Sequence, residues 1–267
     1  MIQKTADIIT NQQLSDTCWR MRLAAGPAIT ASARPGQFVM VRPNGGDRPF
    51  LPRPFSIHRI NKENGSLDLL YKVIGPGTRR MSGLNAGDGL AVTGPLGSGF
   101  RIEQQYENIS IIGGGIGLAP LVFLADVLAA ETPDPFRAEV FIGAATADEI
   151  LCRDEFIDLK MGVHIATDDG SAGHHGFVTE LFGIITKDNP PDMIFACGPP
   201  AMLRATAKIT ASRNIPCQIS IETIMACGIG ACLGCAVKPA GNTSHYLHAC
   251  RQGPVFFSSE IDINSLV

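Results

Sequence analysis

The sequence predicts a mixed β and α/β protein: an antiparallel β-barrel, then a parallel-sheet domain, then a cysteine-rich C-terminal segment. Short β-segments separated by turns fill the first hundred residues, whereas strands alternate with helical patterns from about residue 101. Four of the eight cysteines gather near the C-terminus. Because 267 residues exceed the usual size of one domain, we expect two packed domains and a final segment, with boundaries at 1–100, 101–216 and 217–267.

The barrel prediction rests on β-rich segments spaced as in a barrel or sandwich. Asn-Gly and Gly-Asp pairs mark the turns between them, as in "ENGS" and "NAGDG". The predicted strands are 18–25, 37–43, 54–60, 66–73 and 89–97.

The second domain is predicted from apolar strands that each precede a helical pattern. Such alternation implies a parallel sheet covered on both faces, with its ligand at the carboxyl ends of the strands. The predicted strands are 108–115, 138–145, 163–169, 193–200 and 218–223, and the predicted helices are 118–130, 147–159, 178–186 and 201–213.

Composition argues against nucleic acid and membrane partners. The net charge is -3, and no Lys/Arg run interleaved with aromatic residues occurs. The apolar stretch 109–130 contains four glycines, Pro120 and Asp126, so it predicts a buried strand, turn and helix instead of a membrane span. The N-terminus lacks the apolar core of a signal peptide. We therefore expect a soluble, cytoplasmic protein.

The cysteine segment has the spacing Cys227-x4-Cys232-x2-Cys235, followed by Cys250. Four thiolates can bind zinc or a [2Fe-2S] cluster, and the x4 then x2 spacing favours the plant-type iron-sulfur arrangement. The glycines and alanines between them leave room for backbone N–H groups to approach the sulfurs. A zinc site and ordinary buried thiols remain the alternatives. The other cysteines are interpreted as small buried hydrophobes, with Cys197 a partial exception: Cys18, Cys152, Cys197 and Cys217.

Three glycine- or arginine-containing motifs are suited to phosphate and flavin. "RPFS" at 53–56 lies on a predicted strand, "GPGT" at 75–78 opens a helical pattern, and "GGGIG" at 113–117 joins a strand to a helix. A surface arginine and plain tight turns would produce the same patterns. "CGPPAM" at 197–202 follows another buried strand, where a nicotinamide could lie or a proline-stiffened turn could form.

Taken in order, these motifs and "TDDGSAGHHG" resemble the ferredoxin-NADP reductase superfamily, in which an FAD-binding barrel precedes a pyridine-nucleotide domain. With "MACGIGACLGCAV" and "HACRQGPVF", the whole chain resembles the electron-transfer subunits of class B, NAD-dependent dihydroorotate dehydrogenases. One departure from the wider superfamily is the missing aromatic C-terminus over the flavin, because the chain continues into the cysteine segment.

The resemblance implies three sets of cofactor-binding residues and no catalytic side chain. The FAD set is Arg53, Pro54, Phe55, Ser56, Leu70, Tyr71, Lys72, Gly77 and Thr78. The NAD set is Gly113, Gly114, Gly115, Gly117, Asp168, Asp169, Cys197, Gly198 and Pro199. The [2Fe-2S] ligands are Cys227, Cys232, Cys235 and Cys250.

The resemblance also implies a partner, an FMN-containing catalytic subunit that oxidises dihydroorotate to orotate in pyrimidine biosynthesis, within a heterotetramer of two plus two chains. Electrons would pass from FMN through [2Fe-2S] and FAD to NAD+.

Asp148 and Glu149 follow the second strand of the nucleotide domain and favour NAD(H) over its 2'-phosphorylated form, unless Arg153 lies close. The alternatives are a related subunit serving ferredoxin, a hydrogenase or a sulfite reductase, and a zinc-stapled binding module that is not an enzyme.

Overall fold

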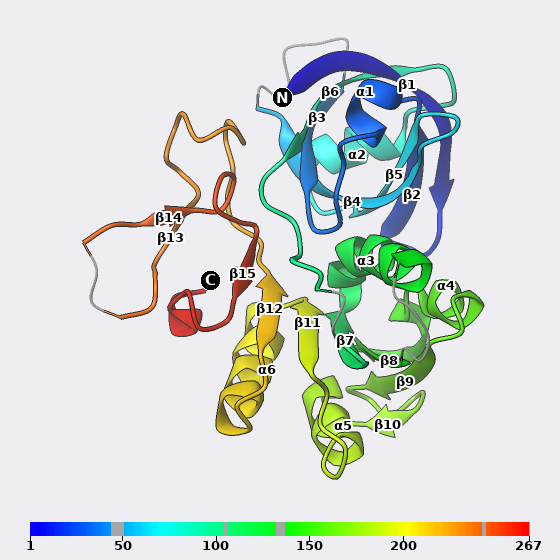
Figure 1. Ribbon diagram of the computed structural model, residues 1–267. Coiled ribbons are helices and arrows are strands. Elements are labelled where there is room, and N and C mark those ends of the chain that lie inside the picture. Colours follow the sequence, from blue (N-terminus) through cyan, green and yellow to red (C-terminus); the bar gives the residue numbers. More distant parts are fainter. Residues whose placement is uncertain (44–50, 104–105, 132–136, 242–243, 267) are drawn as a thin grey trace.

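The computed structural model describes residues 1–43, 51–103, 106–131, 137–241 and 244–266. The barrel and the nucleotide domain are stacked, and the C-terminal segment extends to one side of both (Figure 1). An antiparallel barrel, a parallel sheet with helices, and a C-terminal cysteine segment follow one another in the predicted order. The predicted fold class is confirmed.

The first domain is a closed barrel with the strand order β1-β2-β5-β4-β3-β6, and every pair in it is antiparallel. Alternate residues of β6 are buried, as expected where one face of a strand lines a barrel interior. Short helices α1 (Pro27–Thr30) and α2 (Pro76–Ser82) connect the strands. The strands are β1 (Ile2–Gln13), β2 (Cys18–Leu23), β3 (Phe38–Pro43), β4 (Arg53–Asn61), β5 (Ser66–Lys72) and β6 (Gly89–Leu96).

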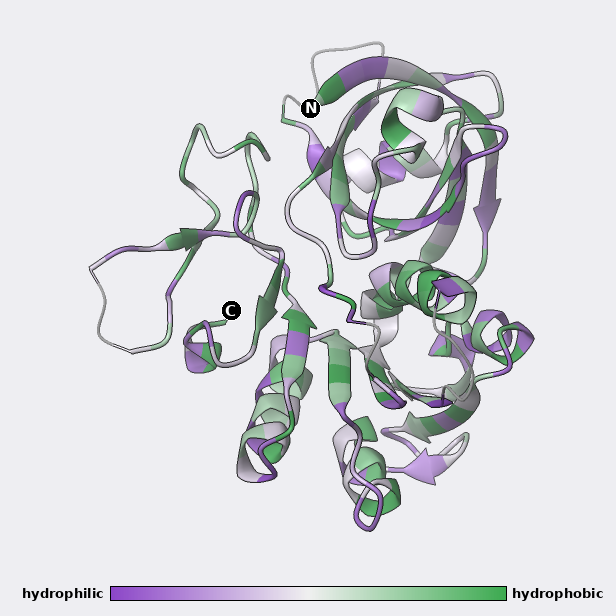
Figure 2. Cartoon of the chain, in the orientation of Figure 1, coloured by the Kyte–Doolittle hydropathy of each residue, from purple (hydrophilic) through white to green (hydrophobic). Residues whose placement is uncertain are grey.

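Strand β1 was not predicted from the sequence, although it closes the barrel by pairing with both β2 and β6. Only Ala6 and Ile8 of its residues are buried, and the rest carry many polar side chains (Figure 2). The alternation of apolar and polar residues is therefore too sparse to be recognised.

The nucleotide domain is built on a seven-stranded sheet with the order β10-β9-β8-β7-β11-β12-β15. All neighbours are parallel except β15, which runs antiparallel to β12. The domain boundary at residue 216 remains a prediction, but the sheet continues through β12 and β15 beyond it. The strands are β7 (Asn108–Gly114), β8 (Arg137–Ala144), β9 (Gly162–Thr167), β10 (His174–His175), β11 (Met193–Cys197), β12 (Cys217–Ser220) and β15 (Val255–Phe257).

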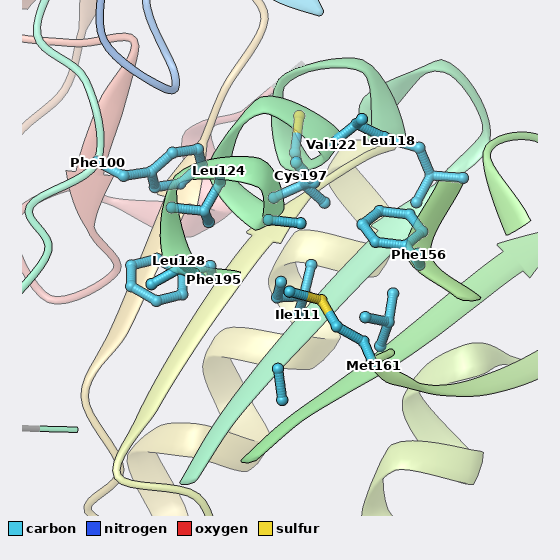
Figure 3. Packing of buried hydrophobic residues seen from close by; sticks show 14 of the residues in the cluster. Phe100, Ile111, Leu118, Val122, Leu124, Leu128, Phe156, Met161, Phe195 and Cys197 are labelled. Atoms are coloured by element: carbon cyan, nitrogen blue, oxygen red, sulfur yellow. The ribbon is translucent and has the colours of Figure 1, made fainter. Parts of the chain in front are cut away.

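Helices cover both faces of this sheet. On one face, α3 (Leu118–Glu131) and α4 (Arg153–Asp158) pack on Ile111 and Phe195 (Figure 3). On the other face, α5 (Val178–Ile185) and α6 (Pro200–Ser212) pack on Ile112 and Ile194. Adjacent residues of one strand therefore enter different cores, which explains the continuous apolar runs of the sequence.

The single helix predicted at 147–159 is in fact divided. A 3-10 turn, η2 (Ala147–Glu149), precedes the shorter α4, and Cys152 between them has a φ of 59°. This left-handed conformation is unusual for a residue with a side chain, and it interrupts the helical path.

Helix α3 joins the two domains because it is buried on two sides. Leu121 and Leu124 pack into the core of the sheet, whereas Phe123, 4% exposed, packs with the apolar residues of the barrel. At the same junction Arg59 of β4 donates two hydrogen bonds to Asp126, of 2.7 and 2.9 Å. None of the helices within the described ranges, α3 included, is long and apolar enough to cross a membrane.

The C-terminal segment leaves the sheet after β12 and returns to it at β15. Between them lie the cysteine loop, 221–235, and a two-stranded sheet of β13 (Ala236–Val237) and β14 (Leu247–His248). The segment also contacts the barrel, because the Ser98 N–H donates to the Gly253 carbonyl. A short η3 (Ile263–Ser265) follows β15.

We expect Phe123→Ala to lower the free energy of unfolding by about 3 kcal/mol, because it removes a large buried side chain from the contact between the domains. Urea denaturation followed by circular dichroism measures the change. Ile184→Ala, on the exposed side of α5, is the matched control and should alter stability by less than about 0.5 kcal/mol. Equal losses in the two variants would contradict this role for Phe123.

Candidate functional site

A cavity of about 450 Å³ lies between the barrel and the nucleotide domain. This volume is within the range of known ligand pockets, and residues of β4, β5, α2 and the chain after β12 line it. We call it the barrel pocket. All nine residues of the predicted FAD set line it: Arg53, Pro54, Phe55, Ser56, Leu70, Tyr71, Lys72, Gly77 and Thr78.

Several of these side chains are already engaged with the protein. The Tyr71 hydroxyl donates to Asn11 Oδ1 of β1 at 2.9 Å, its ring meets Phe55 edge to face, and burial raises the Tyr71 pKa. Thr78 Oγ1 accepts hydrogen bonds from the N–H groups of Ile74 and Gly75. The polar atoms of Tyr71 and Thr78 therefore bond to the protein and shape the pocket. A ligand would contact the backbone and the other lining side chains.

Thr223 provides an independent sign that the barrel pocket receives a polar ligand. Its Oγ1 is buried, lines the pocket and has no hydrogen-bond partner among the described residues. Leaving a buried hydroxyl unpaired costs about 1–3 kcal/mol, so such groups in a cavity usually await a partner. An isoalloxazine ring has several hydrogen-bonding atoms at its polar edge and fits this requirement.

A second cavity of about 660 Å³ lies at the carboxyl ends of the parallel strands. We call it the sheet pocket. Among its lining residues are seven of the predicted NAD set: Gly114, Gly115, Gly117, Asp168, Cys197, Gly198 and Pro199.

Glycine is required at position 117 because the backbone comes very close to the end of β11. A Cβ atom on Gly117 would lie 2.4 Å from the Cys197 carbonyl oxygen. Gly115 has a positive φ of 52°, and a Cβ there would meet open space, so its surroundings leave the backbone accessible. These glycines bring η1 (Gly115–Gly117) against Cys197 and form the wall of the sheet pocket.

Two residues of the predicted NAD set do not line the sheet pocket. Gly113 is covered by Leu118, whose Cδ2 would lie 2.2 Å from a Cβ at that position. Asp169 accepts hydrogen bonds from the hydroxyl and the N–H of Ser171, and these bonds lower its pKa. Both residues thus support the backbone near the pocket without facing it.

The two pockets share a wall, so ligands bound in them would meet. The residues that line both are Lys72, Ile116, Gly117, Cys197, Ile221 and Glu222. Burial raises the pKa of Cys197 to about 12, so its thiol is neutral at pH 7, and burial also raises the pKa of Glu222. Burial therefore disfavours the charged forms of Cys197 and Glu222 at the junction, while Lys72 contributes a cation to the same wall.

Acidic groups lie where the sheet pocket meets the chain after β8 and β9. Glu149 and Asp168 both line it, and Glu149 lies 3.9 Å from Lys72. Arg153 is paired with Asp154 at 2.8 Å and does not line this pocket.

The four clustered cysteines form two pairs. Cys235 and Cys250 are buried, with their Sγ atoms 3.2 Å apart. Cys227 and Cys232 also meet, and the N–H of Cys232 donates to Cys227 Sγ at 3.4 Å. Two thiolates on one tetrahedral ion lie roughly 3.8 Å apart, so the sulfurs of Cys235 and Cys250 need to separate only slightly to share one iron.

The loop favours thiolate at its first cysteine. Burial opposes the charge on Cys227, but hydrogen bonds from the N–H groups of Ile229 and Cys232 outweigh it and lower its pKa to about 6. Gly228 and Gly230 have positive φ values of 70° and 81°, which turn the backbone N–H groups inward. The donor set and the backbone N–H groups thus fit an iron-sulfur cluster.

The cysteine loop begins at the barrel pocket. Met225 lines that pocket two residues before Cys227, and Gly228 packs on Met40 of β3. Pro254, four residues after Cys250, lines the same pocket.

Sequence reasoning missed several lining residues. Thr223 and Met225 follow β12, whose carboxyl end the parallel-sheet rule marks as a ligand site, so a signal for them existed. Met202 lies in the "CGPPAM" motif and Pro254 in "HACRQGPVF", so both had a signal, whereas Phe177 had none.

Three family models match the sequence in order along the chain. They are described as an oxidoreductase FAD-binding domain, residues 5–100, an oxidoreductase NAD-binding domain, residues 111–208, and the iron-sulfur cluster binding domain of dihydroorotate dehydrogenase B, residues 222–262. The last range contains all four clustered cysteines.

Similar proteins cover almost the whole chain. A dihydroorotate dehydrogenase B (NAD(+)) electron transfer subunit from Desulforamulus reducens is 40% identical over 88% of this chain and 89% of its own length. One from Listeria monocytogenes serotype 4a is 37% identical over 98% of this chain and 100% of its own. A chain of the NADH-dependent reduced ferredoxin-NADP oxidoreductase structure superposes with a TM-score of 0.86, at 28% identity over 98% of this chain and 91% of that chain.

These matches agree with the geometry of the site. The barrel is an FAD-binding domain, the parallel-sheet domain is an NAD-binding domain, and the cysteine segment is an iron-sulfur cluster-binding domain. The chain therefore belongs to the electron transfer subunits of NAD-dependent dihydroorotate dehydrogenase B, oxidoreductases of the ferredoxin-NADP reductase superfamily.

Proposed function

We propose that this chain takes electrons from an FMN-containing catalytic subunit that oxidises dihydroorotate to orotate, and delivers them to NAD+ in pyrimidine biosynthesis. One observation carries the proposal. Two pockets share a wall, and a loop with two cysteine pairs starts at the rim of one of them. The names of the relatives support the identity of the substrate and partner.

The cofactors supply the redox chemistry: FAD exchanges two electrons with a nicotinamide and single electrons with an iron-sulfur cluster. The chain's residues bind and orient them. Arg53 to Ser56 and the turn before α2 would hold the FAD in the barrel pocket, and the hydroxyl of Thr223 would bond its ring. Cys227, Cys232, Cys235 and Cys250 would ligate the cluster. Lys72, Cys197 and Glu222 line the junction between the two pockets.

We assign NAD(H), and not its 2'-phosphorylated form, to the sheet pocket. The carboxylates of Glu149 and Asp168 line that pocket, and a 2'-phosphate near them would be repelled. Arg153, the candidate counter-charge, is directed to Asp154. Gly114, Gly115 and Gly117 would face the diphosphate, and Gly198 and Pro199 the nicotinamide end.

The cysteine loop also offers a docking surface for the catalytic subunit. Ile224, Ile229 and Leu233 are 90%, 44% and 58% exposed, which is unusual for apolar side chains so close together in one loop. A partner that covers them would bring its own redox centre close to the cluster. We propose a heterotetramer of two copies of each subunit.

The proposed function is tested by producing the chain together with the FMN subunit from the same genome. Purification without oxygen should yield a complex with FAD, FMN and about two irons per copy of this chain. It should reduce NAD+ with dihydroorotate. A fully loaded complex that is inert to dihydroorotate but reduces ferredoxin would reject the assignment in favour of a ferredoxin-linked reductase, and a colourless zinc protein would reject both.

Cysteine variants check the ligand set within that experiment. Cys232→Ser should lose most of the iron and the transfer to NAD+, while dihydroorotate still bleaches the FMN of the partner. Cys18→Ser is the matched control, since Cys18 is buried in β2 away from the loop, and should keep both irons. Retention of iron by the first variant would contradict the assignment.

We expect Leu233→Asp to weaken the complex with the catalytic subunit about tenfold or more, because it places a charge in a desolvated contact. Aspartate tolerates the positive φ of 58° at this position, so the loop can keep its shape. Ile184→Asp on α5 is the control with a similar exposure. Calorimetry or analytical ultracentrifugation gives the affinity, and no difference between the variants would reject this surface.

We expect Thr223→Val to raise the dissociation constant for FAD about three- to tenfold, because a hydrogen bond is worth about 0.5–1.5 kcal/mol. Flavin fluorescence on release from the protein measures it. Thr210→Val, at a buried hydroxyl that donates to the Ala207 carbonyl away from the pocket, is the control. Unchanged FAD affinity in Thr223→Val would exclude this hydroxyl as a flavin contact.

A further inference from the structure

Three side chains with metal-binding atoms converge where the barrel meets the nucleotide domain. His58 comes from β4, Cys152 from the turn before α4, and Glu155 from α4 itself. One nitrogen, one sulfur and one carboxylate oxygen lie within 4.8 Å of one another. None of the three lines the barrel pocket or the sheet pocket, and none belongs to the cysteine loop.

The His58 ring is held in the orientation and tautomer of a ligand. Its side chain is 1% exposed, and Nδ1 lies 3.0 Å from the Ala119 carbonyl oxygen, which can only accept. Nδ1 therefore carries the proton, and in the neutral ring the lone pair of Nε2 is left available. Metal-binding histidines commonly donate their other N–H to a carbonyl in this way.

The Nε2 atom of His58 is buried and has no hydrogen-bond partner among the described residues. This nitrogen faces Cys152 and Glu155. The Glu155 Oε1 atom lies 3.6 Å from it, which is too far for a hydrogen bond. A buried imidazole nitrogen left unpaired is costly, so a missing partner is expected between these atoms.

We propose that His58 Nε2, Cys152 Sγ and the Glu155 carboxylate bind one zinc ion between the barrel and the nucleotide domain. Nitrogen, sulfur and carboxylate oxygen are the donors zinc prefers, and in a tetrahedral site they lie roughly 3.3–3.6 Å apart. The nitrogen-to-oxygen distance already has this value. A side-chain rotation brings the sulfur closer, and a water completes the site through the partly exposed Cys152 and Glu155.

Two guanidinium groups lie beside this site. Arg20 approaches Glu155 at 3.3 Å, so zinc would compete with it for the carboxylate, whereas Arg59 is neutralised by its two bonds to Asp126. Zinc binding releases the thiol proton of Cys152 to solvent, so the site gains one net positive charge. Because binding releases a proton, zinc binding weakens as the pH falls.

The ion would join the two domains. His58 belongs to the barrel, whereas Cys152 and Glu155 belong to the segment that also carries Glu149, a residue of the sheet pocket. An ion that binds only the docked arrangement stabilises it by linkage, and this stabilisation grows with the logarithm of the free zinc concentration above Kd.

The test uses the chain with FAD and its iron in place, treated with a chelator and then titrated with zinc chloride. We expect one zinc per chain with no loss of iron, and a rise in the thermal midpoint of about 5–10 °C at a free zinc concentration about a hundred times Kd. His58→Gln and Cys152→Ala should each weaken zinc binding at least tenfold and abolish the rise. Cys18→Ala, which removes a buried thiol of β2 in the barrel, should retain both the zinc binding and the rise.

Zinc K-edge absorption of the unaltered protein keeps the test decisive even where a variant fails to fold. One sulfur at about 2.3 Å with nitrogen and oxygen at about 2.0–2.2 Å is expected. The proposal would be overturned if zinc displaced iron, or if the spectrum showed several sulfur ligands or none. It would also be overturned if His58→Gln and Cys152→Ala bound zinc as tightly as the unaltered protein. The absence of stoichiometric binding at micromolar free zinc would overturn it as well.

Discussion

The burial of α3 on two sides is the interaction on which the rest of the structure depends. Phe123 packs into the barrel while Leu121 and Leu124 pack on the sheet, so the two domains share one helix, and the Arg59–Asp126 pair lies beside this apolar contact. Both pockets and the wall between them lie at this junction. A shift of this helix by one turn, about 5.4 Å, would move the sheet relative to the barrel and disrupt the wall that the two pockets share.

The cysteine segment is fixed by the same architecture at both of its ends. It departs from β12 and returns as β15, and these two strands are neighbours in the sheet. The returning chain also packs closely against the end of β6. A Cβ on Gly97 would lie 2.6 Å from the Gly253 carbonyl oxygen. The loop in between can therefore adopt positive φ angles around its sulfurs, since the sheet and the barrel hold its ends in place.

Local patterns sufficed to predict what depends on short stretches of chain. Five barrel strands, the alternation of the nucleotide domain and the cysteine spacing each have a period or composition that a single segment displays. Strand β1 displays no such pattern, because its sequence is largely polar. Its place in the barrel depends on its pairing with β2 and β6. The break at Cys152 and the approach of His58 to it, some ninety residues apart along the chain, arise from domain packing, which no local pattern contains. The family resemblance supplied the FAD set, all of which lines one pocket, but not Thr223, whose role depends on the cavity around it.

The adjacency of β12 and β15 has a topological consequence. The Ile221 N–H donates to the Pro254 carbonyl at 3.0 Å, so the thirty-two residues between these two positions begin and end at the same point of the sheet edge. The length and sequence of such a segment can change with little disturbance to strand order elsewhere. The reason is that each doubling of the loop length adds only about 0.6 kcal/mol to the free energy of loop closure. An electron-transfer module can thus be inserted into, or removed from, a two-domain flavoprotein without redesigning either domain.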